Sequence, residues 1–264
     1  MRGPHNIFRL IRTGATLERT GAMNVILDAY NAPWGVRFGA KVLGWPFQWL
    51  GYKGDTTMPP ATRALTALGP AYIKFGQILS TRPDVVGEEL AVQMRVLQDK
   101  LPPFPTADAK QMIEAELEQP LEALFSEFSE PVAAASIAQV HRGKLISDGS
   151  NVAVKVLRPG IEKAFRRDID AFYFAARMIE TLAPSARRLR PLDVIAHFEG
   201  VVMGELDLRL ESSAAGEFAA NTEADLGFQL PKINWNLSGK NVMTMDWAEG
   251  ISAGDNAALY AAGH

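Results

Sequence analysis

The sequence predicts an α+β fold, in which helices fill the first half of the chain and a β-rich segment follows. Two observations carry this prediction. Apolar residues recur at helical spacing from residue 58 to about residue 125. From residue 131 the pattern changes to two β-rich stretches, 131–146 and 151–159, which are joined by the turn sequence SDGS.

The composition limits what the chain can do. Its 264 residues suffice for one large domain or two small ones. A hydrophobic content of 47% and a charged content of 22% are typical of a soluble globular protein and exclude bulk disorder. The net charge of −3 excludes a general nucleic-acid binder, and the absence of cysteine excludes disulfides and cysteine catalysis. The histidines show no metal-binding spacing, so no metal site is predicted; they are His5, His141, His197 and His264.

Residues 1–57 form the first predicted domain, a basic and aromatic segment. Seven lysines and arginines stand against three acidic residues. Aromatic side chains gather beside Arg37 and Lys41, namely Trp34, Phe38, Trp45, Phe47, Trp49 and Tyr52. This mixture suits the headgroup layer of a membrane, where a ring buries its face and keeps its N–H or O–H hydrated. The alternative is that these rings pack on the rest of the domain or on a partner subunit.

Residues 58–128 form the second predicted domain, a helical extension. One helix ends at Gly69, and Pro70 serves in the first turn of the next, where its missing N–H is not needed. That next helix carries Lys74 and Gln77 inside its most apolar segment. Because these residues are three apart, they share a helix face and can point into one pocket. The alternative is a lysine whose head reaches water from an otherwise buried helix.

Residues 129–264 form the third predicted domain. After the hairpin come helical regions at 160–183 and 191–223 and two strands at 228–236 and 240–248, so we expect an antiparallel sheet of about five strands. Lys155 lies between valines in VAVKV, where a buried ammonium group needs a partner. An edge-strand lysine that reaches water is the alternative. The order of elements is that of a protein-kinase N-lobe: a hairpin with a lysine in its second strand, then a helix with carboxylates, then further strands.

Four motifs follow one another along the chain in the order KFGQ, AAASIAQVH, VAVKVLRPG and ELDLRLE. With them, residues 60–255 resemble the UbiB family of atypical protein-kinase-like proteins. The resemblance implies a kinase-like N-lobe wrapped by the helical extension, with the helix of Lys74 and Gln77 folded over a nucleotide pocket. It implies ATP or ADP as the cofactor, Mg²⁺ for a full-length protein, and a role in ubiquinone biosynthesis.

The resemblance also assigns site residues. Lys155 would contact the nucleotide phosphates and pair with Glu211, and Lys74 would meet the carboxylates of an ExD motif, Glu205 and Asp207. On an ideal helix Glu205 and Asp207 point about 200° apart. We therefore expect Asp207 to be better placed than Glu205, because it shares a face with Glu211. The alternative is a solvated acidic face with Arg209 as its counter-ion.

Backbone groups would hold the rest of the nucleotide. No glycine-rich loop occurs, and an alanine-rich turn takes its place; alanine disfavours the positive φ values that glycine allows. This turn consists of Ala133, Ala134, Ala135, Ser136 and Ile137. The hinge that would meet the adenine edge consists of Asp246, Trp247 and Ala248.

The expected partners are an adenine nucleotide, a membrane surface with a lipid or quinone precursor, and proteins of ubiquinone biosynthesis, with no nucleic acid. The expected location is cytoplasmic, peripheral at the inner membrane. The sequence has neither the catalytic-loop aspartate nor the DFG-type aspartate of a kinase. We therefore expect the N-terminal portion of a longer protein, with the C-lobe missing and no activity by itself. The alternative function is a non-catalytic regulatory or assembly module that binds membrane and biosynthetic partners, and kinase activity toward other proteins is a third option.

Overall fold

The computed structural model describes residues 5–29, 31–98, 103–182, 184–225, 227–251 and 253–263. It confirms the predicted α+β class. The chain divides into two compact units, each assembled from separate stretches of sequence. The helical unit comprises Met1–Pro103, Ala134–Ala138 and Arg158–Leu206, and the sheet unit comprises Phe104–Ala133, Gln139–Leu157 and Asp207–His264. The chain therefore passes from one unit to the other at five points.

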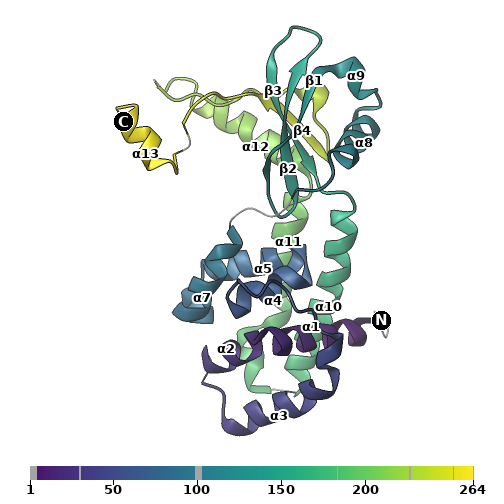
Figure 1. The fold of residues 1–264 in the computed structure, drawn as a ribbon, viewed down its shortest axis with the longest axis vertical. Coiled ribbons are helices and arrows are strands. Elements are labelled where there is room, and N and C mark those ends of the chain that lie inside the picture. The colour runs from purple at the N-terminus through teal and green to yellow at the C-terminus, as the bar shows by residue number, and fades with distance from the viewer. Residues whose placement is uncertain are drawn as a thin grey trace. The chain divides into compact units, whose positions relative to one another are not determined.

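Helices from two parts of the sequence build the helical unit (Figure 1). They are α1 (His5–Thr20), α2 (Ala22–Ala29), α3 (Trp34–Gly44), η1 (Trp45–Leu50), α4 (Pro60–Leu68), α5 (Pro70–Ser80), α6 (Pro83–Val86), α7 (Glu88–Arg95), η2 (Val96–Gln98), α10 (Ile161–Leu182), η3 (Pro184–Leu189) and α11 (Pro191–Glu205). As predicted, α5 begins with Pro70, after Gly69 at a φ of 114°. Within the described residues, no helix combines the length and the apolar character that crossing a bilayer requires.

The helical unit is held together by two sets of contacts. One apolar cluster joins α4, α5, α6, α7 and η2; its buried members are Ala61, Ile73, Val86, Leu90, Ala91, Met94 and Leu97. Separately, the segment after η1 is bound to α1. The N–H of Tyr52 donates to Thr16 Oγ1 over 3.0 Å, and Arg19 Nη1 donates to the Gly51 carbonyl over 2.7 Å. A Cβ atom at Gly51 would lie 2.4 Å from the Ala15 carbonyl oxygen, so only glycine permits this approach.

The sheet unit contains a four-stranded antiparallel sheet in the order β1-β2-β3-β4 (Figure 1). The strands are β1 (Phe125–Ala134), β2 (Ala138–Leu145), β3 (Asn151–Leu157) and β4 (Val242–Asp246). The helices are α8 (Thr106–Leu117), α9 (Leu121–Leu124), α12 (Leu208–Asn221), η4 (Trp235–Leu237) and α13 (Asn256–Ala261). In the antiparallel β3–β4 pair, Lys155 lies opposite Met243.

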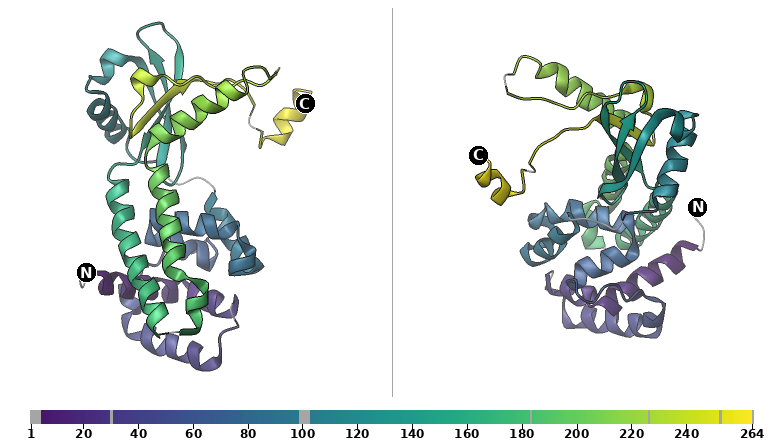
Figure 2. Two further views of the ribbon diagram at one scale, coloured as in Figure 1. Left: turned by 180° about the vertical axis from the view of Figure 1, so that it is seen from behind. Right: turned by 45° about the horizontal axis from the view of Figure 1, so that its top comes forward.

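Strand alternation determines where Lys155 points. Val152, Val154 and Val156 are buried on one face of β3, in a cluster that includes Ile113 of α8. Because successive side chains of a strand alternate between faces, Lys155 lies on the other face. Helix α12 covers that side, and α8 with α9 covers the first (Figure 2).

Three expectations about the elements were wrong. Among the described residues the sheet has four strands, not about five, because residues 228–236 form only the bridge from Ile233 to Met245 and the turn η4. The alanine-rich stretch joins β1 to β2, and the hairpin with its SDGS turn is β2–β3, so an additional strand, β1, precedes it. The region 191–223 is interrupted between Glu205 and Leu208 and forms two helices.

His141 of β2 is fully buried in the sheet unit and belongs to a hydrogen-bond chain. Its Nδ1 lies 2.8 Å from the Ser129 carbonyl and its Nε2 lies 2.9 Å from Gln139 Nε2, while Gln139 Oε1 accepts from the N–H of Phe104. Both ring nitrogens are therefore satisfied by a neutral imidazole that donates from Nδ1. Burial lowers the pKa of His141, which favours the same neutral form. These contacts give His141 a structural role. The side chains of His5 and His264 lie outside the described residues.

We predict that Gly51→Ala destabilises the helical unit by about 1–3 kcal/mol, because the new methyl group overlaps the backbone of α1. Thermal unfolding followed by circular dichroism measures the effect. The matched control is Gly14→Ala on α1, where a Cβ meets no atom within 4 Å; there alanine should stabilise the helix by about 0.5–1 kcal/mol. Equal effects of the two substitutions would refute the close approach at Gly51.

Candidate functional site

The lysine of β3 meets a carboxylate of α12 in the sheet unit. Lys155 Nζ lies 2.5 Å from Glu211 Oε1 and 2.6 Å from Oε2, so both carboxylate oxygens accept from one ammonium group. About a quarter of the Lys155 side chain is exposed. The pairing expected from the sequence is thus present.

The start of α12 fixes the position of Glu211. Asp207 is the N-cap residue, and its side chain accepts from the N–H of Arg209 over 3.1 Å. Glu211 lies in the first helical turn, where a carboxylate interacts favourably with the positive end of the helix dipole. One turn into the helix, Ser212 Oγ donates to the Leu208 carbonyl, and the N–H of Leu208 donates to the carbonyl of Lys240 over 2.9 Å.

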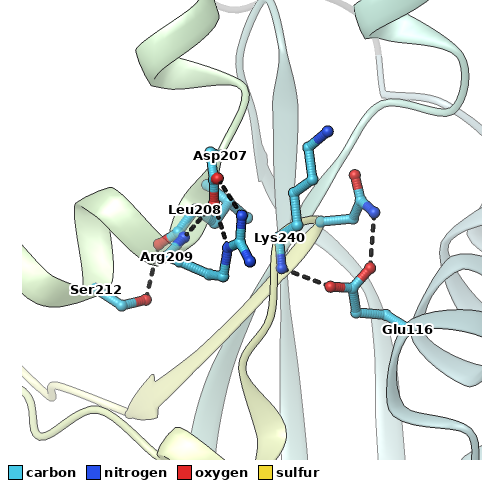
Figure 3. Close-up of polar contacts among 7 residues, drawn as sticks. Glu116, Asp207, Leu208, Arg209, Ser212 and Lys240 are labelled. Atoms are coloured by element: carbon cyan, nitrogen blue, oxygen red, sulfur yellow. Dashed lines mark hydrogen bonds and ion pairs between the residues drawn. The ribbon is translucent and has the colours of Figure 1, made fainter.

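A contact that the sequence analysis missed holds the loop before β4. Glu116 of α8 accepts through Oε1 from the N–H of Lys240 and through Oε2 from Asn241 Nδ2, at 2.5 and 2.6 Å (Figure 3). A Cβ at Gly239 would lie 2.2 Å from Glu116 Oε1. Lys240 is therefore bound from two sides, by α8 and by the first turn of α12. No sequence pattern points to this contact, because its partners lie 124 residues apart.

Asp207 pairs with its own neighbour. Arg209 Nε and Nη2 donate to the two Asp207 carboxylate oxygens over 2.8 and 2.6 Å (Figure 3). The Arg209 hydrogen bonds are the main reason that the pKa of Asp207 lies below its ordinary value, and the charge of Lys240 contributes least. For Asp207, the arrangement matches the alternative in which Arg209 is the counter-ion.

The lysine of KFGQ pairs with the other carboxylate of ELDLRLE. Within the helical unit, Lys74 Nζ on α5 lies 2.5 Å from Glu205 Oε2 at the end of α11. We expected Asp207 to be better placed than Glu205, and this was wrong. The expectation assumed one continuous helix, whereas α11 ends at Glu205 and α12 begins at Leu208. The two carboxylates therefore belong to different helices.

Gln77 and Gly76 attach α5 to the neighbouring helices. Gln77 Nε2 donates to the Leu97 carbonyl over 2.7 Å. A Cβ at Gly76 would lie 2.5 Å from a methyl carbon of Leu97 and 2.6 Å from one of Leu65. Within the described residues, Lys74 and Gln77 thus have different partners, an ion pair to α11 and a hydrogen bond to η2.

The alanine-rich turn adopts ordinary backbone geometry. Ala133 and Ala134 end β1, and residues 133–137 all avoid positive φ values. The N–H of Ala135 donates to the Ala138 carbonyl, and the N–H of Arg158 donates to the Ile137 carbonyl, each over 2.8 Å. Ser136 is buried. The turn therefore needs no glycine.

The predicted hinge has few free backbone donors. The N–H of Asp246 donates to the Lys232 carbonyl over 3.0 Å, and the N–H of Trp247 donates to the Asn151 carbonyl over 3.1 Å. The amides of Asp246 and Trp247 are therefore already paired within the sheet unit. The Trp247 ring lies 5.0 Å from the guanidinium of Arg142, and its buried Nε1 has no hydrogen-bond partner among the described residues.

We predict that Lys74 and Glu205 are energetically coupled. A double-mutant cycle of Lys74→Met and Glu205→Gln, measured by urea denaturation, should give a coupling free energy of about 1 kcal/mol, because the pair is partly buried. The matched control pairs Lys74→Met with Asp207→Asn. That cycle should be additive to within about 0.5 kcal/mol. Coupling to Asp207 in place of Glu205 would contradict the arrangement.

The comparisons with known proteins agree with these motifs. Residues 96–264 match the family model of the ABC1 atypical kinase-like domain. Among the relatives named "Probable protein kinase UbiB", one from Marinobacter nauticus is 42% identical, and the match covers 76% of this chain and 37% of the relative. One from Pseudomonas aeruginosa is 38% identical, and the match covers 94% of this chain and 46% of the relative. One from Shewanella baltica is 37% identical, and the match covers 99% of this chain and 46% of the relative.

Among solved structures, one described as the Rv3197–erythromycin complex from Mycobacterium tuberculosis is similar to this chain. The sequence identity is 29% and the TM-score is 0.48, and the match covers 69% of this chain and 46% of the mycobacterial chain. The chain spans about half the length, or less, of the curated relatives it matches. The predicted resemblance to UbiB proteins is confirmed, and the chain belongs to the ABC1 atypical kinase-like family.

Proposed function

We propose that this chain forms the adenine-nucleotide-binding region of a UbiB-like atypical kinase. In this proposal it binds ATP or ADP and supports ubiquinone biosynthesis from the cytoplasmic face of the inner membrane. The observation that carries the proposal is the ion pair between Lys155 and Glu211. Family membership supports it, because kinases use a strand lysine and a helix glutamate to hold the nucleotide phosphates.

The proposed roles follow from the chemistry of each group. The Lys155 ammonium has three donors, and Glu211 directs it while leaving capacity for phosphate oxygens. The alanine-rich turn lies next to the phosphates, and the amide of Ala248 meets the adenine. Mg²⁺ bridges nucleotide phosphates and neutralises their charge. In this proposal Mg²⁺ is used by the full-length protein. Among the described residues, no group of three or more His, Asp or Glu side chains could hold a metal ion.

The membrane part of the proposal rests on exposed aromatic side chains of the helical unit. Trp34, Phe38 and Val42 recur at intervals of four along α3, so they share one face, and they are 82%, 63% and 52% exposed. Trp49 of η1 is 74% exposed. Phe47 and Tyr52 are exposed as well, and the side chain of Trp45 lies outside the described residues. Exposed apolar clusters mark interaction sites, and rings beside lysine and arginine suit a lipid headgroup layer.

We predict that the chain binds ADP or ATP and that Lys155→Ala weakens binding by about tenfold or more, because a charge-assisted contact to phosphate is lost. Isothermal titration calorimetry, with and without Mg²⁺, measures the dissociation constant. The matched control is Lys144→Ala on β2, whose ammonium group faces Glu127 at 3.4 Å. It should leave nucleotide affinity unchanged.

Equal binding by wild type and Lys155→Ala would overturn the assignment of the pocket. A folded wild-type chain that binds no nucleotide would instead favour the non-catalytic regulatory or assembly module. In cells whose gene carries Lys155→Ala, the ubiquinone content should fall while the Lys144→Ala strain matches wild type. An unchanged ubiquinone content in the Lys155→Ala strain would show that ubiquinone biosynthesis does not require the nucleotide site.

We predict that the chain sediments with vesicles that contain anionic lipid. The double variant Trp34→Ala and Phe38→Ala should lower the partition coefficient by about a hundredfold or more, because each buried ring contributes about 1.5–3 kcal/mol. The control is Tyr260→Ala in α13, whose ring is 80% exposed in the sheet unit. If both variants bind vesicles like wild type, the face of α3 is not the membrane contact.

A further inference from the structure

The helical unit contains an apolar groove that the nucleotide site does not use. Five elements line it: α5, α6, α10, η3 and α11. Its volume of about 710 Å³ falls in the range of about 300–1,000 Å³ that is usual for small-molecule sites. Two of these elements, α10 and α11, run side by side as an antiparallel pair (Figure 2).

Aromatic packing makes the floor of the groove firm. Phe75 of α5 and Phe172 of α10 both line the groove, and their ring centroids lie 5.5 Å apart. Phe198 of α11 contacts Phe75 edge to face, with the ring centroids 5.2 Å apart. Ala176 and Ile195, which are buried, complete the floor. Three helices therefore fix the floor, and a ligand would meet a preformed apolar surface.

The walls of the groove are apolar and accessible. Val85, Ile179, Leu189 and Val194 line it from four different elements, and between 46% and 60% of each residue is exposed. Single exposed apolar residues are common on proteins, but four that converge on one groove with an aromatic floor mark a binding surface.

The charge at the rim identifies the polar end of the occupant. Asp84 lines the groove, but Arg82 neutralises it with hydrogen bonds from Nε and Nη2, the latter over 2.8 Å. Those bonds also hold the pKa of Asp84 below its ordinary value. Arg188 of η3 lines the groove as well, and among the described residues its guanidinium has no hydrogen-bond or ion-pair partner. The charge available to a ligand is therefore a guanidinium.

We propose that this groove binds a single-chain anionic amphiphile. The apolar chain lies on the floor of Phe75 and Phe172, and the carboxylate or phosphate head meets Arg188, whose planar fork suits such groups. A bound chain would touch both α5 and α11, the helices whose Lys74 and Glu205 form the ion pair described above. Occupancy should therefore hold these two helices together.

The test uses the full chain and a dansyl-labelled undecanoic acid, whose fluorescence rises on entering an apolar site. Saturable binding of one probe per chain is expected, with displacement by oleic acid and much weaker displacement by oleyl alcohol. Ala175→Trp fills the groove and should abolish binding. Arg188→Gln removes the head-group contact and should weaken binding by about tenfold. The control is Arg177→Gln, an exposed arginine of α10 outside the groove lining, which should bind like wild type.

Each outcome decides the proposal. Equal displacement by acid and alcohol, or full affinity of Arg188→Gln, would overturn the anionic head. Unchanged binding by a folded Ala175→Trp chain would overturn the groove as the site. Probe binding that disappears as protein concentration rises, together with dimers in sedimentation velocity, would show that a second copy covers the groove and would overturn the amphiphile. A rise of the melting temperature with oleic acid in wild type but not in Ala175→Trp supports the proposal. None of these results depends on nucleotide binding.

Discussion

The ammonium group of Lys155 is the constraint on which the sheet unit depends. It lies on a central strand between buried valines, and an unpaired charge there would be very costly. Glu211 removes this cost only if the first turn of α12 is held against the sheet. Three contacts hold this turn. Asp207 caps the helix, the N–H of Leu208 donates to the carbonyl of Lys240, and Glu116 accepts a hydrogen bond from the N–H of Lys240. Backbone contacts from α8 and α12 thus converge on Lys240, and they hold the helix turn that presents Glu211 to Lys155.

Much of this arrangement could be predicted from the sequence. Pro70 fixed the start of α5, and the apolar period of 161–182 gave α10. Valines on alternate positions placed Lys155 on a strand, and the order of the motifs identified the family. These features depend on local rules, namely proline geometry and periodicity, and on patterns that a single sequence displays.

What could not be predicted depends on contacts between distant residues. Strand β1 begins with FSEFSE, in which phenylalanine recurs every third residue, and only Phe125 of the strand is buried, so its sequence lacks the period of two that signals a strand. The interruption at Leu206 and Asp207 follows Gly204, but a single glycine does not by itself end a helix. The new helix begins where the N–H of Leu208 donates to the carbonyl of Lys240, 32 residues further along the chain. The preference for Asp207 over Glu205 failed for the same reason, since helix geometry was applied across a break.

Because the chain crosses between the two units five times, a simple truncation cannot separate one unit from the other. Neither unit is a continuous segment, since α10 and α11 are inserted between β3 and α12, yet α10 packs against α1 and α5. Removing the first hundred residues would therefore leave a tethered helical hairpin with Phe172 and Phe198 stripped of their partners on α5. An isolated sheet unit could be expressed only by replacing residues 158–206 with a short linker, and its folding would then no longer depend on the helices encoded earlier in the gene.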